Sequence, residues 1–293
     1  MPFLQVRVQS RHPEFAEEIL LGHGASSVSL VDAGDDPILE PPLGESPLWP
    51  TTIAIGLFAD DASAADVEVA VRELLPDGAT CLFQTERVED QDWVRVWLED
   101  CPPLKFGERL WVCPRERRVD EPGCTTLILD PGLAFGTGTH PSTALCLDWL
   151  ARNAVAHQRV VDFGCGSGIL GIAALLLGAR ECTAFDIDPQ AIQATHDNAR
   201  ENGVASRLRT IAHDETFEPF PADLVLANIL ARPLVELAPL LARCVRVGGA
   251  IVLAGLLDRQ ADEVRDAYAP WFTFEPDGRR EGWTRIAGRR RDA

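Results

Sequence analysis

A glycine-rich segment that follows a short apolar run constrains the fold of this chain most. Residues 160–162, Val-Val-Asp, lead into three alternate glycines at Gly164, Gly166 and Gly168. Glycine lacks a Cβ, so the backbone turns tightly there and a ligand can lie against it. The apolar residues 169–174 that follow predict a helix. This strand, turn and helix predict a ligand pocket at the carboxyl end of the first strand of a doubly wound sheet.

Two acidic residues narrow the class of ligand. Asp162 lies just before the turn, where a carboxylate is expected to face a cation and to repel a pyrophosphate. Asp186 ends the next apolar strand, at the spacing typical of an acid that binds ribose hydroxyls. A ligand with a ribose, a positive charge and no phosphate satisfies both acids. S-adenosylmethionine is such a ligand, with a sulfonium, an ammonium and an adenosine.

Strands and helices alternate through the rest of the chain, which predicts an α/β domain with a mostly parallel, Rossmann-like sheet. The expected strands are 160–163, 182–186, 208–211, 224–228, 250–254, 271–275 and 284–287, with helices at 189–202 and 234–244 among those between them. The last two strands are close enough in sequence to form an antiparallel pair. The carboxyl end of strand 224–228 should lie beside that of strand 160–163, so Asn228 is expected to face the reactive end of the cofactor.

The first part of the chain predicts a second domain. Strands at 3–8, 26–31, 52–58 and 81–88, with helices at 13–21 and 64–75, give the order βαββαβ of a ferredoxin-like α+β fold. This segment has no catalytic motif and is typical of a recognition module. A helix at 89–99 with Trp93 and Trp97 on one face is expected to join the parts. The predicted organisation is 1–88, a linker helix within 89–103, and 104–293.

The loop before the first expected core helix is rich in Gly and Thr. Residues 130–143 include Gly136, Gly138 and His140, and Pro141 is well suited to the first turn of a helix. A glycine-punctuated loop beside a ligand site favours a lid over a spacer. His140 is a candidate general base by residue type and position.

Charge and cysteine usage exclude several classes of protein. The net charge is −18, and residues 1–89 hold 16 Asp and Glu against 4 Lys and Arg, which leaves −12 there and −6 in the remainder. Such a front segment repels nucleic acid and favours a basic partner. The eight cysteines show no C-x-x-C pair and no metal-ligand spacing. With no signal-peptide pattern and no apolar run that spans a membrane, the expectation is a cytoplasmic, metal-free protein.

Several of these motifs together resemble one family. The segments 129–143, 160–168, 185–189 and 228–230 are similar to those of the bacterial methyltransferases that modify protein eleven of the large ribosomal subunit, and the similarity extends over the whole chain. The resemblance implies a class I methyltransferase domain in which Thr143, Gly164, Asp186 and Asn228 bind S-adenosylmethionine. It also implies that the front domain grips the protein substrate, a basic ribosomal protein taken before assembly.

The residues after the fourth strand indicate the acceptor. Residues 228–231 read Asn-Ile-Leu-Ala, without the Pro-Pro and aromatic residues that clamp a planar amide or base. An aliphatic amine, either a lysine or the N-terminal α-amine, is the better fit. A lysine, with an ordinary pKa of about 10.4, must lose a proton before attack. Asn228 and His140 are the two catalytic candidates.

Two alternatives of other classes stay open from the residues alone. The run 166–171 fits the dinucleotide pattern G-x-G-x-x-G, which by itself allows an NAD-dependent oxidoreductase. Asp162 and Asn228 argue against it. The second alternative is a cofactor-binding module without catalysis and with an acidic docking domain, which the Gly-Thr loop argues against.

Overall fold

The computed structural model describes residues 2–34, 48–49, 51–88, 102–130, 136, 138–211 and 217–292. Its contacts divide the chain into two units, Met1–Trp93 and Val94–Ala293. The boundary falls outside the described residues, so the domain limits stay a prediction. The expected linker helix with Trp93 and Trp97 also lies outside them.

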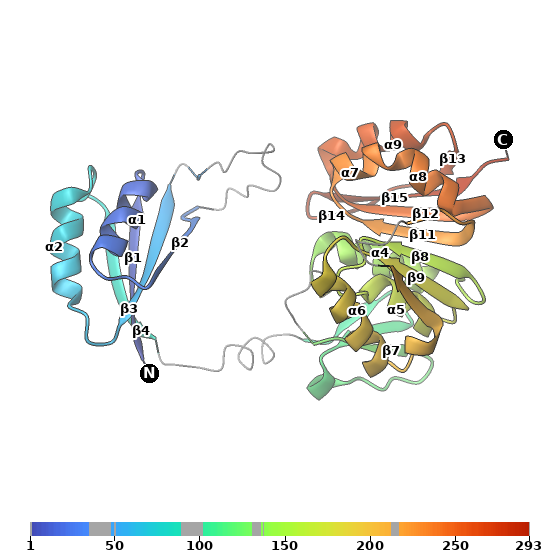
Figure 1. Cartoon of the computed structure of the whole chain (residues 1–293), viewed down its shortest axis with the longest axis horizontal. Coiled ribbons are helices and arrows are strands. Elements are labelled where there is room, and N and C mark those ends of the chain that lie inside the picture. The colour runs from blue at the N-terminus through green and yellow to red at the C-terminus, as the bar shows by residue number, and fades with distance from the viewer. Residues whose placement is uncertain are drawn as a thin grey trace. The chain divides into compact units, whose positions relative to one another are not determined.

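The front unit has the predicted ferredoxin-like arrangement. Its elements are β1 (Phe3–Ser10), α1 (Pro13–Gly22), β2 (Ser27–Asp32), β3 (Thr52–Ala59), α2 (Ala64–Leu74) and β4 (Leu82–Val88), in an antiparallel sheet of order β2-β3-β1-β4. Helix α1 begins at Pro13, and the Ser63 hydroxyl caps α2 by accepting the N–H of Asp66. Alternate residues of β1 and β3 pack with both helices, and no other helix of the described residues covers the opposite face of the sheet (Figure 1).

The back unit is built on an eight-stranded sheet. The strands β10 (Leu208–Ile211), β9 (Glu181–Phe185), β8 (Arg159–Phe163), β11 (Ala222–Asn228) and β12 (Val245–Leu257) are parallel, in that order. Beyond β12, β15 (Trp283–Arg290) is antiparallel to β12, β13 (Phe272–Phe274) and β14 (Gly278–Arg280). The order along the sheet therefore reverses between β8 and β11, and a ligand site is expected there at the carboxyl edge.

Helices cover both faces of this sheet. On one face lie α4 (Pro141–Arg152), α5 (Ile169–Leu176) and α6 (Pro189–Glu201), and on the other α7 (Ala231–Glu236), α8 (Ala238–Cys244) and α9 (Ala261–Tyr268) (Figure 1). A three-stranded sheet of β5 (Leu104–Phe106), β6 (Leu110–Cys113) and β7 (Thr125–Ile128) joins the first layer. The described residues of this unit also form three short 3₁₀ turns, Arg115–Arg117, Ala205–Arg207 and Asp258–Gln260. The α/β prediction, with an antiparallel pair at the end, is confirmed.

Some local predictions need correction. The helix expected over 234–244 is two helices, because Pro239 lacks an N–H and clashes with a helix continuing from α7. The strand expected at 250–254 extends over all of β12. The short strands β5 and β14 were not predicted, since three residues carry too little alternation to reveal a strand.

Candidate functional site

The glycine turn lies at the carboxyl end of β8, as predicted. Gly164, Gly166 and Gly168 all have positive φ, at 73°, 55° and 78°, and Gly168 caps α5. A Cβ at Gly164 would lie 2.3 Å from the Cγ2 of Ile229. This first turn position therefore requires glycine for two independent reasons, backbone conformation and a close neighbour from the segment after β11.

Asp186 is tied to this turn from the next strand. Its Oδ2 accepts the Gly166 N–H at 2.9 Å, and its Oδ1 accepts the Asp188 N–H at 3.0 Å. The side chain is half-buried. Because each carboxylate oxygen has two lone pairs, both oxygens keep one acceptor position for a ligand such as a ribose diol.

Asp162 lies in β8 just before the turn, with its side chain buried. The residue is 1% exposed, and its Oδ2 accepts the N–H of Gly171 in helix α5 at 2.8 Å. Burial raises the pKa of its carboxyl to about 7, and the nearby charge of Asp186 acts in the same direction. The side chain of Asp162 therefore supports the turn from beneath, and its direct contact with a cationic ligand stays a prediction.

The end of β11 carries a buried polar pair. The Nδ2 of Asn228 donates to the Oγ1 of Thr143, a fully buried residue of α4, at 3.1 Å. The Oδ1 of Asn228 is buried and has no hydrogen-bond partner within the described part of the chain. A hydroxyl both donates and accepts, so either orientation of the amide satisfies one of its polar atoms and leaves the other open. An unpaired buried amide atom is costly, which points to a ligand or substrate group as its partner.

His140 immediately precedes α4 and caps it. Its Nδ1 accepts the N–H of Ser142 at 3.3 Å and lies 2.8 Å from the hydroxyl oxygen of the same residue. The ring contacts Trp283 edge-to-face, with centroids 4.6 Å apart. Burial lowers the pKa of His140, against the opposing charge of Glu281. The helix begins at Pro141, as predicted.

The loop before α4 lies against the glycine turn. The buried Ser167 hydroxyl donates to the backbone oxygen of Gly136 at 2.6 Å. Both Gly136 and Gly138 have positive φ, and a Cβ at Gly138 would lie 3.4 Å from Ile169. The rest of the expected lid, residues 131–135 and 137, lies outside the described residues. The lid function stays a prediction.

Sequence reasoning missed two residues that hold the turn. Ser167 stands between Gly166 and Gly168, and its position in the turn was a usable signal of a structural role. Thr195, in the middle of α6, donates from its Oγ1 to the backbone oxygen of Gly166 at 3.0 Å. A Cβ at Gly168 would lie 2.8 Å from Thr195, so the helix seals the turn. Nothing in the local sequence around Thr195 marks this contact.

The cysteine of the turn is a packing residue. Cys165 is buried, burial raises the pKa of its thiol, and its Sγ lies 3.3 Å from the Oγ1 of Thr195. Among the residues that the structure describes, no three His, Cys, Asp or Glu side chains gather as metal ligands. No helix within the described ranges is long and apolar enough to cross a membrane.

Comparison with known proteins agrees with this geometry. The family model "Ribosomal protein L11 methyltransferase (PrmA)" matches residues 2–291. Relatives described as ribosomal protein L11 methyltransferases include one from Azotobacter vinelandii, 50% identical over 99% of this chain and 100% of the relative. Another, from Aeromonas salmonicida, is 47% identical over 99% of each chain.

A solved structure supports the same assignment. The crystal structure of ribosomal protein L11 methylase from Lactobacillus delbrueckii subsp. bulgaricus is 29% identical, with a TM-score of 0.59 over 66% of this chain and all of that one. The oxidoreductase and the module without catalysis are thereby set aside. The chain belongs to the ribosomal protein L11 methyltransferase (PrmA) family and is an S-adenosylmethionine-dependent protein methyltransferase that acts on ribosomal protein L11.

Proposed function

We propose that the acceptor atom is an uncharged amine nitrogen of the L11 substrate, a lysine side chain or the N-terminal α-amine, and that Asn228 holds it. The observation that carries this proposal is the unpaired, buried Oδ1 of Asn228 at the carboxyl edge of the sheet. That oxygen accepts one N–H of an amine, which orients the nitrogen lone pair. Thr143 fixes the Asn228 side chain through its Oγ1.

The residues of the turn fit the cofactor. Asp186 has acceptor positions left for ribose hydroxyls, and the glycines of the turn leave room for a ligand against the backbone. When bound, S-adenosylmethionine supplies a methyl group activated by the sulfonium charge. We assign Thr143, Gly164, Gly166, Gly168, Asp186 and Asn228 to the cofactor site, with Asp162 supporting it from below.

The acceptor lysine must be neutral at the moment of attack. An apolar environment lowers the pKa of a lysine because it disfavours the ammonium. Ile229 and Leu230 directly follow Asn228 and supply apolar surface at this edge, with Leu230 exposed. Of the two catalytic candidates, Asn228 is the better supported. The Nδ1 of His140 accepts the Ser142 N–H, so the neutral ring carries its proton on Nε2 and has no lone pair left for a substrate proton.

The front unit captures the substrate before ribosome assembly, in the cytoplasm and without contact to nucleic acid. Its charge of −12 over residues 1–89 suits a basic ribosomal protein. The sheet face that α1 and α2 leave without a helix carries Ile53, Ile55 and Leu57 of β3, each half-buried. An apolar stripe on an acidic unit offers both packing and charge attraction to such a partner.

Mass spectrometry of L11 methylated with a deuterated methyl donor tests the acceptor assignment. We expect every labelled methyl on a lysine or on the N-terminal amine. Labelled methyls on glutamine, asparagine or arginine side chains would refute the amine proposal. A salt series tests capture: the kcat/KM for L11 should fall several-fold between low salt and 0.3 M NaCl, while S-adenosylmethionine affinity changes little.

A further inference from the structure

A cavity lies at the edge of the large sheet opposite the glycine turn. It has a volume of about 440 Å³ and is lined chiefly by Arg159, Thr183, Ser206, Arg207, Arg209 and Phe220. Strands β8, β9 and β10 are parallel, and their first residues border the cavity. The cavity is therefore at the amino-terminal edge of these strands, whereas the glycine turn is at their carboxyl edge. We call it the arginine cavity.

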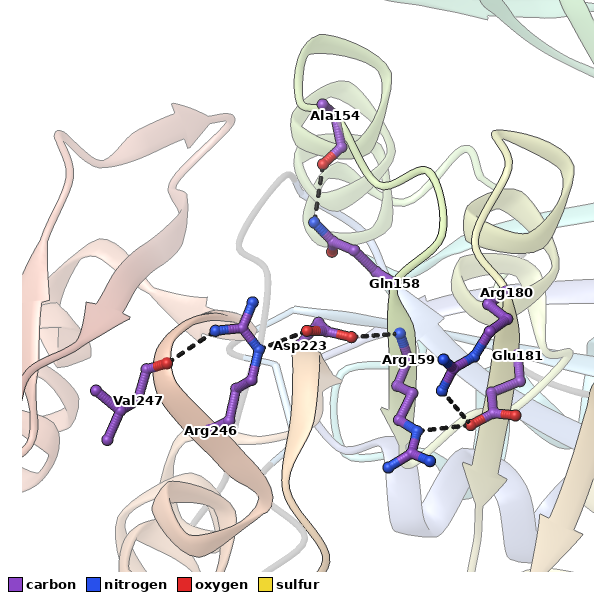
Figure 2. Close-up of polar contacts among 8 residues, drawn as sticks. All are labelled: Ala154, Gln158, Arg159, Arg180, Glu181, Asp223, Arg246 and Val247. Atoms are coloured by element: carbon purple, nitrogen blue, oxygen red, sulfur yellow. Dashed lines mark hydrogen bonds and ion pairs between the residues drawn. The ribbon is translucent and has the colours of Figure 1, made fainter.

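The acids around the arginine cavity are already paired. One oxygen of Glu181 lies 2.8 Å from the Nε of Arg159 and 3.1 Å from the Nη2 of Arg180. Asp223 pairs with Arg246 and also accepts the backbone N–H of Arg159 at 2.7 Å (Figure 2). The hydrogen bond from Arg180 lowers the pKa of Glu181, so this carboxylate stays charged and engaged. Two arginines share the single charge of Glu181.

The other two arginines of the cavity have no counter-charge among the residues that the structure describes. Arg207 donates from Nη1 to the backbone oxygen of Ala179 at 2.8 Å, which orients the guanidinium without neutralising it. Arg209 is exposed and forms no hydrogen bond or ion pair from its side chain with any residue in the described ranges. It lies opposite Thr183 in the β10–β9 register. In a chain of net charge −18, this is a local excess of positive charge.

We propose that the arginine cavity binds the phosphate group of a small phosphorylated molecule. A guanidinium group can form bidentate hydrogen bonds to two phosphate oxygens. Arg207 and Arg209 have unused N–H donors for such bonds. The hydroxyls of Thr183 and Ser206 add donors, and Phe220 adds an apolar wall. The volume lies within the roughly 300–1,000 Å³ of small-molecule sites. This site is separate from methyl transfer and does not depend on it.

Calorimetric titration of the full chain with inorganic phosphate, and then with AMP, tests the proposal. Saturating S-adenosylhomocysteine keeps AMP out of the adenosine site, and sodium chloride holds the ionic strength constant. We expect binding to the wild type and at least ~10-fold weaker binding to Arg209→Gln. Arg289→Gln is the matched control, since Arg289 is an exposed arginine of β15, three strand positions from β8, that also forms no side-chain interaction with any described residue. It should bind like the wild type.

Side-chain NMR of the arginine Nε–Hε groups places the ligand. Phosphate should shift the signals of Arg207 and Arg209 in the wild type and leave that of Arg289 in place. Equal phosphate affinity in Arg209→Gln and Arg289→Gln would overturn the proposal. So would an absence of phosphate and AMP binding, including the case in which a single-stranded oligouridylate alone binds, since that result would indicate an RNA surface.

Discussion

The two sheets of this chain differ in how many of their faces are covered. In the front sheet, β1 and β3 alternate between buried and half-buried residues, because helices pack on one face only. In the back sheet, β8 and β11 are buried on both faces. An antiparallel sheet with one uncovered face presents a broad surface to a binding partner. A parallel sheet covered on both faces leaves only its strand ends accessible to a ligand. The front sheet is therefore suited to recognition of a protein partner, and the strand ends of the back sheet are suited to a reacting site.

The carboxyl edge of the back sheet carries polar groups with spare bonding capacity. At the carboxyl edge of the back sheet, Asp186 keeps acceptor positions and Asn228 keeps an unpaired oxygen. In the front unit, the half-buried Asp77 accepts the Ser10 hydroxyl on one oxygen and the Arg11 N–H on the other, and these two bonds tie the end of β1 to the segment after α2. We therefore expect the front unit to contribute charge and surface and the back unit to contribute the reacting site. Changes in the front unit should affect the kcat/KM for L11, whereas substitutions in the back unit should affect kcat or S-adenosylmethionine affinity.

Deleting residues 1–88 separates the two roles most completely. The front unit has a hydrophobic core of its own, so the remainder keeps both layers of its core. We expect S-adenosylmethionine affinity within about 2-fold of the full chain and a kcat/KM for L11 lowered by about 10³-fold or more, because remote binding energy is lost. Unchanged kcat/KM in a steady-state assay would refute the division of labour.

Asn228→Ala tests the reacting site without touching the front unit. Loss of the group that orients the amine should lower kcat by about 10²–10³-fold, the range for a single oriented hydrogen-bonding group at a reacting centre. The affinity for L11, measured by calorimetry, should stay within about 2-fold. Ser29→Ala on β2 of the front sheet is the matched control and should leave kcat unchanged. A normal kcat in Asn228→Ala would remove Asn228 from the mechanism.

Much of this arrangement could be predicted from the sequence. Local signals predict the elements of the front unit. Alternating apolar residues mark its strands, and Pro13 and the Ser63 cap mark the starts of its two helices. Glycines with positive φ mark the turn. The contact between Thr195 and the turn could not be predicted, because it joins segments distant in sequence that only packing brings together.

The burial of Asp162 could have been predicted from the sequence. Side chains alternate along a strand, so Asp162 shares a face with Val160, which packs in the core layer under α5. Charge alone was used to predict a ligand contact for this residue, and that contact stays a prediction. The break between α7 and α8 was likewise readable from Pro239.

The contributions of Asp162 and Asp77 to the stability of their units should change with pH in opposite directions. Burial raises the pKa of Asp162 to about 7, so its contribution to stability is full below about pH 4 and is lost as the pH rises through 7. Burial opposes ionisation of Asp77, but the hydrogen bonds from Ser10 and Arg11 outweigh it and lower its pKa. The contribution of Asp77 is therefore present above about pH 4 and is lost in stronger acid.

Asp162→Asn tests this difference. Between pH 5 and 8 the wild-type back unit should lose about 2–3 kcal/mol of stability in denaturant melts, and the variant should lose little. Asparagine keeps an oxygen to accept the Gly171 N–H, so the turn is preserved. The front unit should behave alike in both proteins. An identical pH dependence of the back unit in the two proteins would show that Asp162 does not titrate in this range.

Asp186→Ala should weaken S-adenosylmethionine binding by roughly 1.5–3 kcal/mol, the range for hydrogen bonds to charged groups. The variant loses the acceptor for ribose hydroxyls and also the bonds to the N–H groups of Gly166 and Asp188. Asp188→Asn, which keeps the cap of α6, is the control. Titration by calorimetry gives both affinities, and coincident curves for wild type and Asp186→Ala would exclude the ribose assignment.

His140→Asn should have the smallest effect and decides between the two catalytic candidates. Asparagine also caps helices, so the variant keeps an acceptor for the Ser142 N–H at the start of α4. We expect kcat within about 3-fold of the wild type and a stability loss below ~1 kcal/mol, because His140 serves the helix and the contact with Trp283. The pH profile of kcat should be unchanged, since burial keeps the ring neutral above its lowered pKa. A loss of more than about 100-fold in kcat, together with the disappearance of one ionisation from the profile and intact L11 affinity, would make His140 the general base and return Asn228 to cofactor binding alone.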